Sequence, residues 1–238
     1  MDKKNKELFS KEITAAATTY WGMDVLQYPG DSGMQNIWNN SPLYFTGFYL
    51  APAPNQSYTG WMNKRSILLE QGWGFLPLYL GRQHSDSNLT AAQGKTDAQD
   101  AISLADKAGF DESTFHTYIY LDIEQGGRLE TKYINYIKAW VTEVNASADY
   151  WAGIYCSYSD TAQQIYDAIG SSASRYWVFN LNKYSCSDVP SGTAPDPSGS
   201  GVSFASTWQL VQNCNKTFGS TTLSKVDIDS STRKDPSQ

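Results

Sequence analysis

The sequence contains few of the residues on which metal-dependent and thiol-dependent chemistry rests. It has two histidines, His84 and His116, and three cysteines, Cys156, Cys186 and Cys214. The cysteines lack metal-ligand spacing and no histidine accompanies them, which argues against a structural zinc site and a cysteine nucleophile. We therefore expect no metal and no cofactor. The first cysteine lies in an apolar segment and is expected to be a buried thiol, whereas the other two lie in loop-like sequence and can pair if the protein is exported.

Long apolar runs and clusters of basic residues are also missing. No segment approaches the roughly 18 apolar residues that a membrane span needs. The formal net charge is -6 and, beyond the first few residues, Lys and Arg are scattered, which argues against nucleic acid and anionic membranes as partners. The N-terminus has a basic start without an uninterrupted apolar segment, so it does not have the pattern of a signal peptide. We expect residues 1–20 to form an N-terminal arm or a lead-in helix.

Aromatic residues are abundant by comparison. They make up 14% of the chain, with 8 Trp and 16 Tyr, and rings with one polar edge suit surfaces that stack on sugars, although they also fill ordinary cores. The 238 residues suit one large core, and α/β barrels commonly use this length as a single domain. We expect residues 21–238 to form one domain and the protein to be a monomer.

Short strand-like segments alternate with helical patterns over the first three quarters of the chain. The expected strands are residues 22–27, 44–50, 72–81, 117–124, 150–157 and 175–182. The expected helices are residues 58–71, 96–108, 130–146 and 160–169. A Pro-, Gly- and Ser-rich stretch at 185–201 ends the alternation, and two further strands are expected at 202–210 and 225–229 with no helix between them. The pattern predicts an α/β fold, a TIM-like (β/α) barrel of eight strands with helices missing between the last strands.

The strand TYIYLDIE ends with two carboxylates, Asp122 and Glu124. Side chains two residues apart on a strand point to the same face, and the strands of such a barrel end at one common opening where catalytic groups gather. The residues expected near these ends are Asp24, Tyr49, Tyr79, Asp122, Glu124, Tyr155, Asn180, Gln209, Asp227 and Asp229.

Paired carboxylates without a metal or nucleophile motif fit cleavage of a glycosidic bond. One acid keeps its proton and donates it to the leaving oxygen, while another stays ionised and stabilises positive charge on the sugar. Two plainer interpretations compete with this one. The strand end can simply be solvated or bind loop N–H groups, and clustered acids also suit a divalent cation, although no Asp-x-Asp-x-Asp-Gly calcium loop is present. The tyrosines at these strand ends are individually more typical of core or lining positions.

Taken together and in order, many motifs resemble the glycoside-hydrolase-like family catalogued as domain of unknown function 1906, over roughly residues 21 to 230. The motifs are GMDVLQ, PGDSGMQNIWNNSPLYFTGFYLAPAP, SNLTAAQGKTDAQDAISLA, IYLDIEQGG, YWAGIYCSY, WVFNLN, WQ and VDIDSS. The chain is more distantly similar to the muramidases of glycoside hydrolase family 25, which share the Asp-x-Glu strand and the terminal Trp-Gln and Val-Asp strands. The resemblance implies a barrel that ends in consecutive strands, a glycan substrate and an extracellular location.

Residue by residue, the muramidase resemblance implies that Glu124 is the general acid. Asp122 would stabilise charge or position a substrate acetamido group, and Asp24 and Asp227 would hold those two in place. The chain departs from the muramidase pattern at Asp229, where muramidases tend to have Asn.

Two functions from different classes remain open at this level. The first is a glycoside hydrolase acting on a cell-wall or extracellular polysaccharide, with peptidoglycan as the leading substrate. The second is a catalytically degenerate barrel that binds a glycan without cutting it. In either, the residues expected to bind the glycan are Tyr49, Tyr79, Tyr155, Asn180, Gln209 and Asp229.

Overall fold

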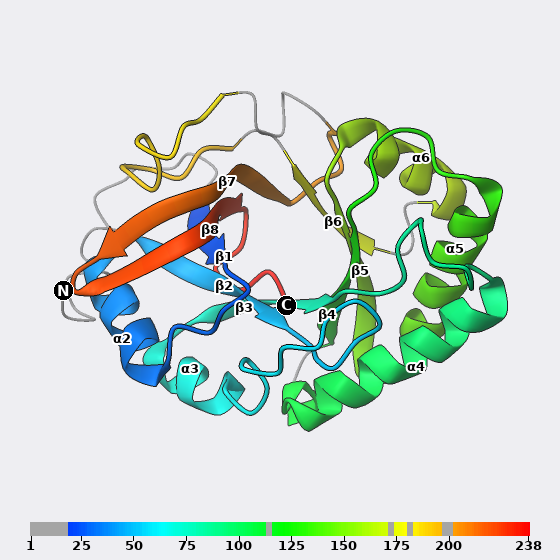
Figure 1. Ribbon diagram of the computed structural model, residues 1–238, viewed down its shortest axis with the longest axis horizontal. Helices are drawn as coiled ribbons and strands as arrows, with labels where there is room; N and C mark the ends of the chain where they lie inside the picture. The colour runs from blue at the N-terminus through cyan, green and yellow to red at the C-terminus, as the bar shows by residue number, and fades with distance from the viewer. Residues whose placement is uncertain (1–18, 113–115, 171–173, 180–182, 197–201) are drawn as a thin grey trace.

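The computed structural model describes residues 19–238 except 113–115, 171–173, 180–182 and 197–201. Eight strands close a barrel in chain order from β1 to β8 (Figure 1). Neighbouring strands from β1 to β7 are parallel, whereas β8 is antiparallel to both β7 and β1. The strands are β1 Tyr20–Asp24, β2 Leu43–Tyr49, β3 Gly74–Tyr79, β4 Thr117–Ile123, β5 Tyr150–Cys156, β6 Ser174–Phe179, β7 Thr207–Phe218 and β8 Thr221–Ser231. The predicted eight-stranded α/β barrel is confirmed. The arm or lead-in helix predicted for residues 1–20 falls almost wholly outside the described residues.

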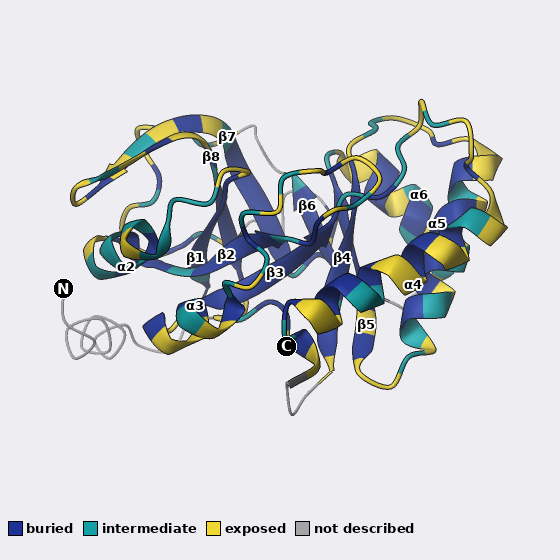
Figure 2. Cartoon of the chain, turned by 60° about the horizontal axis from the view of Figure 1, so that its bottom comes forward, coloured by how far each residue is buried: buried dark blue, intermediate teal, exposed yellow. Residues whose placement is uncertain are grey.

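Helices connect the first six strands and cover the outside of the barrel. They are α2 Asp31–Asn40, α3 Arg65–Gln71, α4 Ala91–Lys107, α5 Thr131–Asn145 and α6 Ser159–Ile169, with a short 3₁₀ turn η1 at Phe110–Glu112. Figure 1 shows α4, α5 and α6 along one side, and α2 and α3 on the other. In Figure 2 the strands are buried along most of their length and the helices are buried on the side that faces them. None of the helices in the described part of the chain is long and apolar enough to cross a membrane.

Three helices differ from the sequence-based expectation, each for a local reason. Helix α2 was not expected because its sequence is rich in Gly, Ser and Asn, which favour turns, yet Met34, Ile37 and Trp38 form a buried stripe. Helix α3 begins late because Asn63 adopts a φ of 61°, a left-handed conformation that does not continue a helix. Helix α4 begins early, where the Thr90 side chain accepts a 3.1 Å hydrogen bond from the backbone N–H of Gln93.

The last two strands form an antiparallel hairpin that is longer than predicted. The polar segment 212–217 resembles a loop in sequence, but it continues β7 beyond the barrel. Asn36 of α2 donates hydrogen bonds to the Phe218 backbone at 2.7 Å and to the Thr221 hydroxyl at 2.9 Å, so the hairpin tip is attached to α2. A disulfide between Cys186 and Cys214 links the stretch before β7 to the hairpin. Cys156 is a buried free thiol, as predicted.

Side chains fill the inside of the barrel below its C-terminal opening. An apolar inner cluster comprises Phe45, Leu76, Leu78, Tyr120, Tyr155 and Trp177. Gly153 makes room for one ring, because a Cβ there would lie 2.6 Å from Tyr120. The C-terminal residues close the opposite end, where Tyr118 N–H donates to the Ser237 carbonyl and the Tyr120 hydroxyl to the Pro236 carbonyl, each at 2.8 Å. Groups able to meet a substrate therefore lie at the opening formed by the strand C-termini.

Candidate active site

Strand β4 carries the acidic pair that ends TYIYLDIE. Its inward positions are Tyr118, Tyr120 and Asp122, and Glu124 follows the end of the strand. Asp122 is 7% exposed, whereas Glu124 is exposed to solvent. Burial raises the pKa of the Asp122 carboxyl well above its usual range, and the charges of Glu124 and Asp24 raise it further. The pair thus combines a deep carboxyl with one at the rim.

Asp122 also has an unsatisfied oxygen. Its Oδ1 atom is buried and, among the described residues, has no hydrogen-bond partner. Buried polar atoms of this kind are uncommon, and each leaves an acceptor that an incoming N–H or O–H can satisfy.

Asp24 and Asp227 form a second acidic group where β1 and β8 meet. The two residues are partners across the antiparallel strands. The Tyr49 hydroxyl donates to Asp24 Oδ1 at 2.8 Å. Gln209 Nε2 donates to Asp24 Oδ2 at 3.1 Å and to Asp227 Oδ2 at 2.9 Å. Because one amide nitrogen binds both carboxylates, Gln209 fixes the distance between them.

Asp227 receives one further hydrogen bond, from the backbone N–H of Asn213 to its Oδ1 atom at 2.7 Å. Burial raises the pKa of Asp227 to about 8, with a further contribution from the charge of Asp24. The proton on Asp227 is therefore retained over most of the acidic range.

Asp229 lies deeper in the barrel and is fully buried. Trp177 Nε1 donates to its Oδ1 atom at 3.2 Å, while its Oδ2 atom is buried without a donor in the described part of the chain. Burial is the largest cause of the raised pKa of both Asp24 and Asp229, and the charges of Asp24 and Asp227 raise that of Asp229 further. The neutral form of Asp229 is therefore favoured.

Two tyrosines complete the hydrogen-bond network around these acids. The Tyr155 hydroxyl donates to Gln209 Oε1 at 2.8 Å, and Gln212 Nε2 donates to the same oxygen at 2.8 Å. Burial, together with the neighbouring carboxylates, raises the pKa of Tyr49 and Tyr155 well above the usual range, so both remain hydroxyl donors. The structure thus brings together most of the residues expected from the sequence: Asp24, Tyr49, Asp122, Tyr155, Gln209, Asp227 and Asp229, with Glu124 at the rim.

Two expected residues do not join this group. Since Leu76 and Leu78 point into the barrel, the alternation of β3 turns Tyr79 outward, where its hydroxyl donates to Asp100 of α4 at 2.9 Å. The prediction that Tyr79 lies with the residues at the barrel opening is therefore wrong. Asn180 lies outside the described residues.

Two other residues of the site were not identified from the sequence. Trp177 donates a hydrogen bond to Asp229. Strand alternation in the segment 175–182 could have identified it, because that alternation places Trp177 on the inward face. Gln83 contacts the backbone on both sides of Ile123. It comes from the β3–α4 connection, where no periodic pattern marks a residue.

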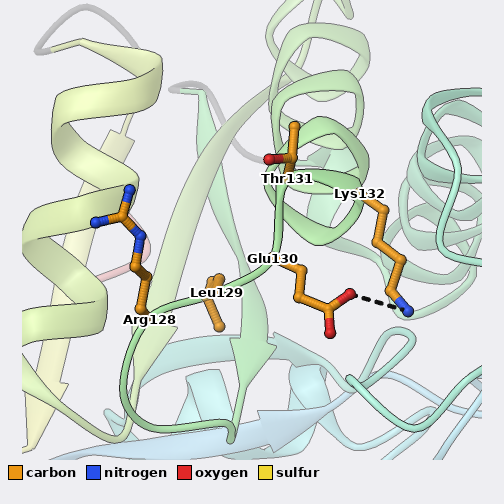
Figure 3. A pocket seen from close by; sticks show the side chains of 5 residues that line it. All are labelled: Arg128, Leu129, Glu130, Thr131 and Lys132. Carbon is orange, nitrogen blue, oxygen red and sulfur yellow. Dashed lines mark ion pairs between the residues drawn. The ribbon is translucent and has the colours of Figure 1, made fainter.

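An open hollow of about 540 Å³ lies beside the end of the loop that connects β4 to α5 (Figure 3). It is lined by Arg128, Leu129, Glu130, Thr131 and Lys132. The Lys132 ammonium pairs with the Glu130 carboxylate at 3.2 Å. None of the acidic residues at the barrel opening lines this hollow, so it is separate from the candidate site. Within the described ranges, no group of three or more His, Cys, Asp and Glu side chains is placed to hold a metal ion.

Comparisons with known proteins agree with this architecture. Residues 36–231 match the family model described as Rv2525c-like, glycoside hydrolase-like domain. Among solved structures, an uncharacterized protein of B. stearothermophilus is similar, with a TM-score of 0.61 and 19% identity over 88% of this chain and 94% of that chain. No match is found among curated proteins.

Two further similar structures carry functional names. One is a bacterial lysozyme from Streptomyces coelicolor, with a TM-score of 0.59 and 17% identity over 91% of this chain and 92% of that chain. The other is a family 25 glycosyl hydrolase from Bacillus anthracis, with a TM-score of 0.57 and 11% identity over 89% and 88%. At these identities the likeness shows a common fold.

Proposed function

The chain belongs to the Rv2525c-like, glycoside hydrolase-like domain family, and from that premise we propose that it is a glycosidase of a cell-wall or extracellular polysaccharide. Peptidoglycan is the first substrate to test, because similar folds include a lysozyme and a family 25 glycosyl hydrolase. The observation that carries the proposal is the acidic pair of β4, with a buried carboxyl at Asp122 and an exposed one at Glu124.

Glu124 has the proton-donating role in this proposal. It lies at the rim of the opening, where a glycosidic oxygen can approach it from solvent. A carboxyl group at this position can donate its proton to the leaving oxygen of a sugar bound across the opening.

Asp122 receives and orients the substrate beside that bond. Its unsatisfied Oδ1 atom can accept an N–H or O–H, such as that of an acetamido group. Asp24, which accepts hydrogen bonds from Tyr49 and Gln209 that lower its pKa, is the carboxyl best placed to carry negative charge. That charge would stabilise the positive charge that develops on the sugar ring.

Tyr49, Tyr155, Gln209 and Asp229 hold the acidic group in this scheme. Tyr49 and Gln209 donate to Asp24, and Tyr155 donates to Gln209. Asp229 accepts from Trp177. We therefore assign them to positioning the acids, with Asp227 held by the same Gln209 amide.

Glycan binding without cleavage is the competing function, and one observation favours it. Burial raises the pKa of Asp24, Asp122, Asp227 and Asp229, which favours the neutral form of each of these deep carboxyl groups. A barrel that is neutral at its floor can still bind sugar hydroxyls through its carboxyl groups.

We also propose that the protein works outside the cytoplasm. The Cys186–Cys214 disulfide supports this location because disulfides persist mainly in oxidising compartments. A wall polymer would be accessible there.

The function is tested by incubating the protein with insoluble peptidoglycan, chitin and β-glucans, and measuring both new reducing ends and sedimentation of the protein with each polymer. Release of reducing ends by the native protein but not by Glu124→Gln would support the hydrolase. Sedimentation of both proteins with one polymer, and no new ends between pH 4 and pH 8, would support the binding function and overturn the hydrolase.

A further inference from the structure

The pairing of strand β4 with β3 ends at Leu121, one residue before the acidic pair begins. β3 and β4 pair only through Leu78 with Tyr120 and Tyr79 with Leu121, because β3 ends at Tyr79. On the opposite side, β5 continues to pair with β4 as far as Ile123. The backbone of β4 around Asp122 would therefore be open on its β3 side.

The side chain of Gln83 fills this position. Its Nε2 atom donates to the backbone carbonyl of Asp122 at 2.8 Å, and its Oε1 atom accepts from the backbone N–H of Glu124 at 3.2 Å. In a strand, the C=O of one residue and the N–H of the second residue after it point to the same side. A primary amide offers the same donor and acceptor as a peptide group, so Gln83 replaces the missing strand for one step.

Gln83 is itself held in place from two directions. Its backbone N–H donates to Asp86 Oδ2 at 2.6 Å, and Asn55 donates to the same oxygen at 3.0 Å. The Tyr133 hydroxyl of α5 has one proton, which it shares between the Arg82 carbonyl at 2.9 Å and Gln83 Oε1 at 3.2 Å. These contacts fix which end of the amide faces Asp122 and which faces Glu124.

We propose that Gln83 is a positioning residue that fixes the Asp122–Ile123–Glu124 backbone and so sets the relative orientation of the two carboxyl groups. Its importance for turnover rests on the proposed function, whereas its hold on the backbone does not. Misplacing a catalytic group by about 1 Å can cost on the order of 100-fold in rate.

The test compares Gln83→Met with a matched control, Gln164→Met. Methionine keeps the approximate length of glutamine and removes its amide. Gln164 makes the same two kinds of bond, to Leu129 N–H at 2.7 Å and to Leu129 C=O at 3.0 Å, farther along the same loop. On purified peptidoglycan, we expect Gln83→Met to lower kcat by about 10- to 100-fold with less than about a twofold change in KM. Gln164→Met should leave both constants close to those of the native protein.

A second variant separates the two hydrogen bonds. Gln83→Glu keeps an acceptor for the Glu124 N–H but loses the donor to the Asp122 carbonyl. Its kcat should lie at or below that of Gln83→Met, because its charge also faces the carbonyl oxygen. A kcat equal to that of the native protein in Gln83→Met would overturn the proposal.

Amide hydrogen exchange tests whether Gln83 holds the backbone of Glu124, and it requires no enzymatic activity. The Glu124 amide should exchange about tenfold faster in Gln83→Met than in the native protein or in Gln164→Met, while the Leu129 amide should respond only to Gln164→Met. If the native protein releases no reducing ends, the hydrolase proposal fails and exchange alone judges the role of Gln83. Unchanged protection of Glu124 in Gln83→Met would overturn that role whether or not the protein is an enzyme.

Discussion

Trp177 Nε1 donates a 3.2 Å hydrogen bond to the Oδ1 atom of Asp229 at the floor of the barrel opening. Asp229 is fully buried, and its Oδ2 atom has no hydrogen-bond donor in the described part of the chain. Burial and the charges of Asp24 and Asp227 raise the pKa of Asp229 well above its usual range. The neutral form of Asp229 is therefore favoured.

Replacing Asp229 with Asn should accordingly be tolerated. The amide oxygen can still accept from Trp177 Nε1, and the amide carries no charge to bury. We expect Asp229→Asn to unfold at pH 7 at a temperature equal to or above that of the native protein, as measured by thermal denaturation.

The matched change is Asp229→Leu, which keeps the approximate volume and removes both hydrogen-bonding atoms. It should lower the free energy of unfolding by about 1 to 3 kcal/mol, because the buried Trp177 N–H loses its acceptor. A strongly destabilised Asn variant together with a stable Leu variant would contradict a neutral Asp229 that accepts from Trp177.

Stability should fall as pH rises through the acidic and neutral range. The pKa of Asp227 is about 8 in the folded protein against an ordinary value of 3.8. Between these values the folded state binds a proton that the unfolded state has lost, so this contribution is complete below the lower value and is gone above the upper one. The expected slope is at most about 1.4 kcal/mol per pH unit for each such proton.

Urea denaturation at intervals between pH 4 and pH 9 measures this slope. In Asp227→Asn the decline should be shallower, because the amide does not titrate. Parallel curves for the native protein and the variant would show that Asp227 has no raised pKa.

The Cys186–Cys214 disulfide should contribute about 3 to 4 kcal/mol to stability, because it closes a loop with a sequence separation of 28. Reduction with dithiothreitol should lower the midpoint of thermal unfolding of the native protein. A variant with both cysteines replaced by Ser should already be destabilised and should not respond to the reductant, since Cys156 is an unpaired thiol. An equal response of both proteins would argue against this pairing.

Gly153→Ala should destabilise the barrel by about 1 to 3 kcal/mol. The added methyl group would lie 2.6 to 2.8 Å from three ring atoms of Tyr120, which is held by the Pro236 carbonyl. Gly33→Ala in α2 is the control, because its Cβ meets nothing nearer than 3.2 Å and Ala favours a helix. Chemical denaturation of both variants measures the difference, and a Gly153→Ala protein as stable as Gly33→Ala would contradict the packing described for the barrel interior.

The barrel was predictable because strand and helix signals alternate and then stop. Elements with a strong apolar stripe, such as α5, were placed to within a residue or two of their ends. The elements that were missed depend on tertiary contacts: α2 on its packing against the barrel, and the outer half of the β7–β8 hairpin on its hydrogen bonds to Asn36. Local sequence does not report such contacts.

The acidic residues of the site were also predictable, because strand alternation places Asp24, Asp122, Asp227 and Asp229 on inward faces. Tyr79 was expected to face the barrel interior, but it is one residue out of step with the inward positions of its strand. A shift of one residue turns a side chain from the barrel interior to the helix layer. Gln83 had no signal, since it acts from an irregular connection on the backbone of a distant strand.

The central claim is that Glu124 donates a proton to a glycosidic oxygen, and the rate of reducing-end release from purified peptidoglycan tests it most directly. The comparison is between the native protein, Glu124→Gln and Glu130→Gln. The last variant removes a carboxylate that lies at the end of the same loop and pairs with Lys132 of α5. We expect measurable release by the native protein and by Glu130→Gln, and a loss of about 100-fold or more in Glu124→Gln. Equal release by all three proteins would contradict the claim.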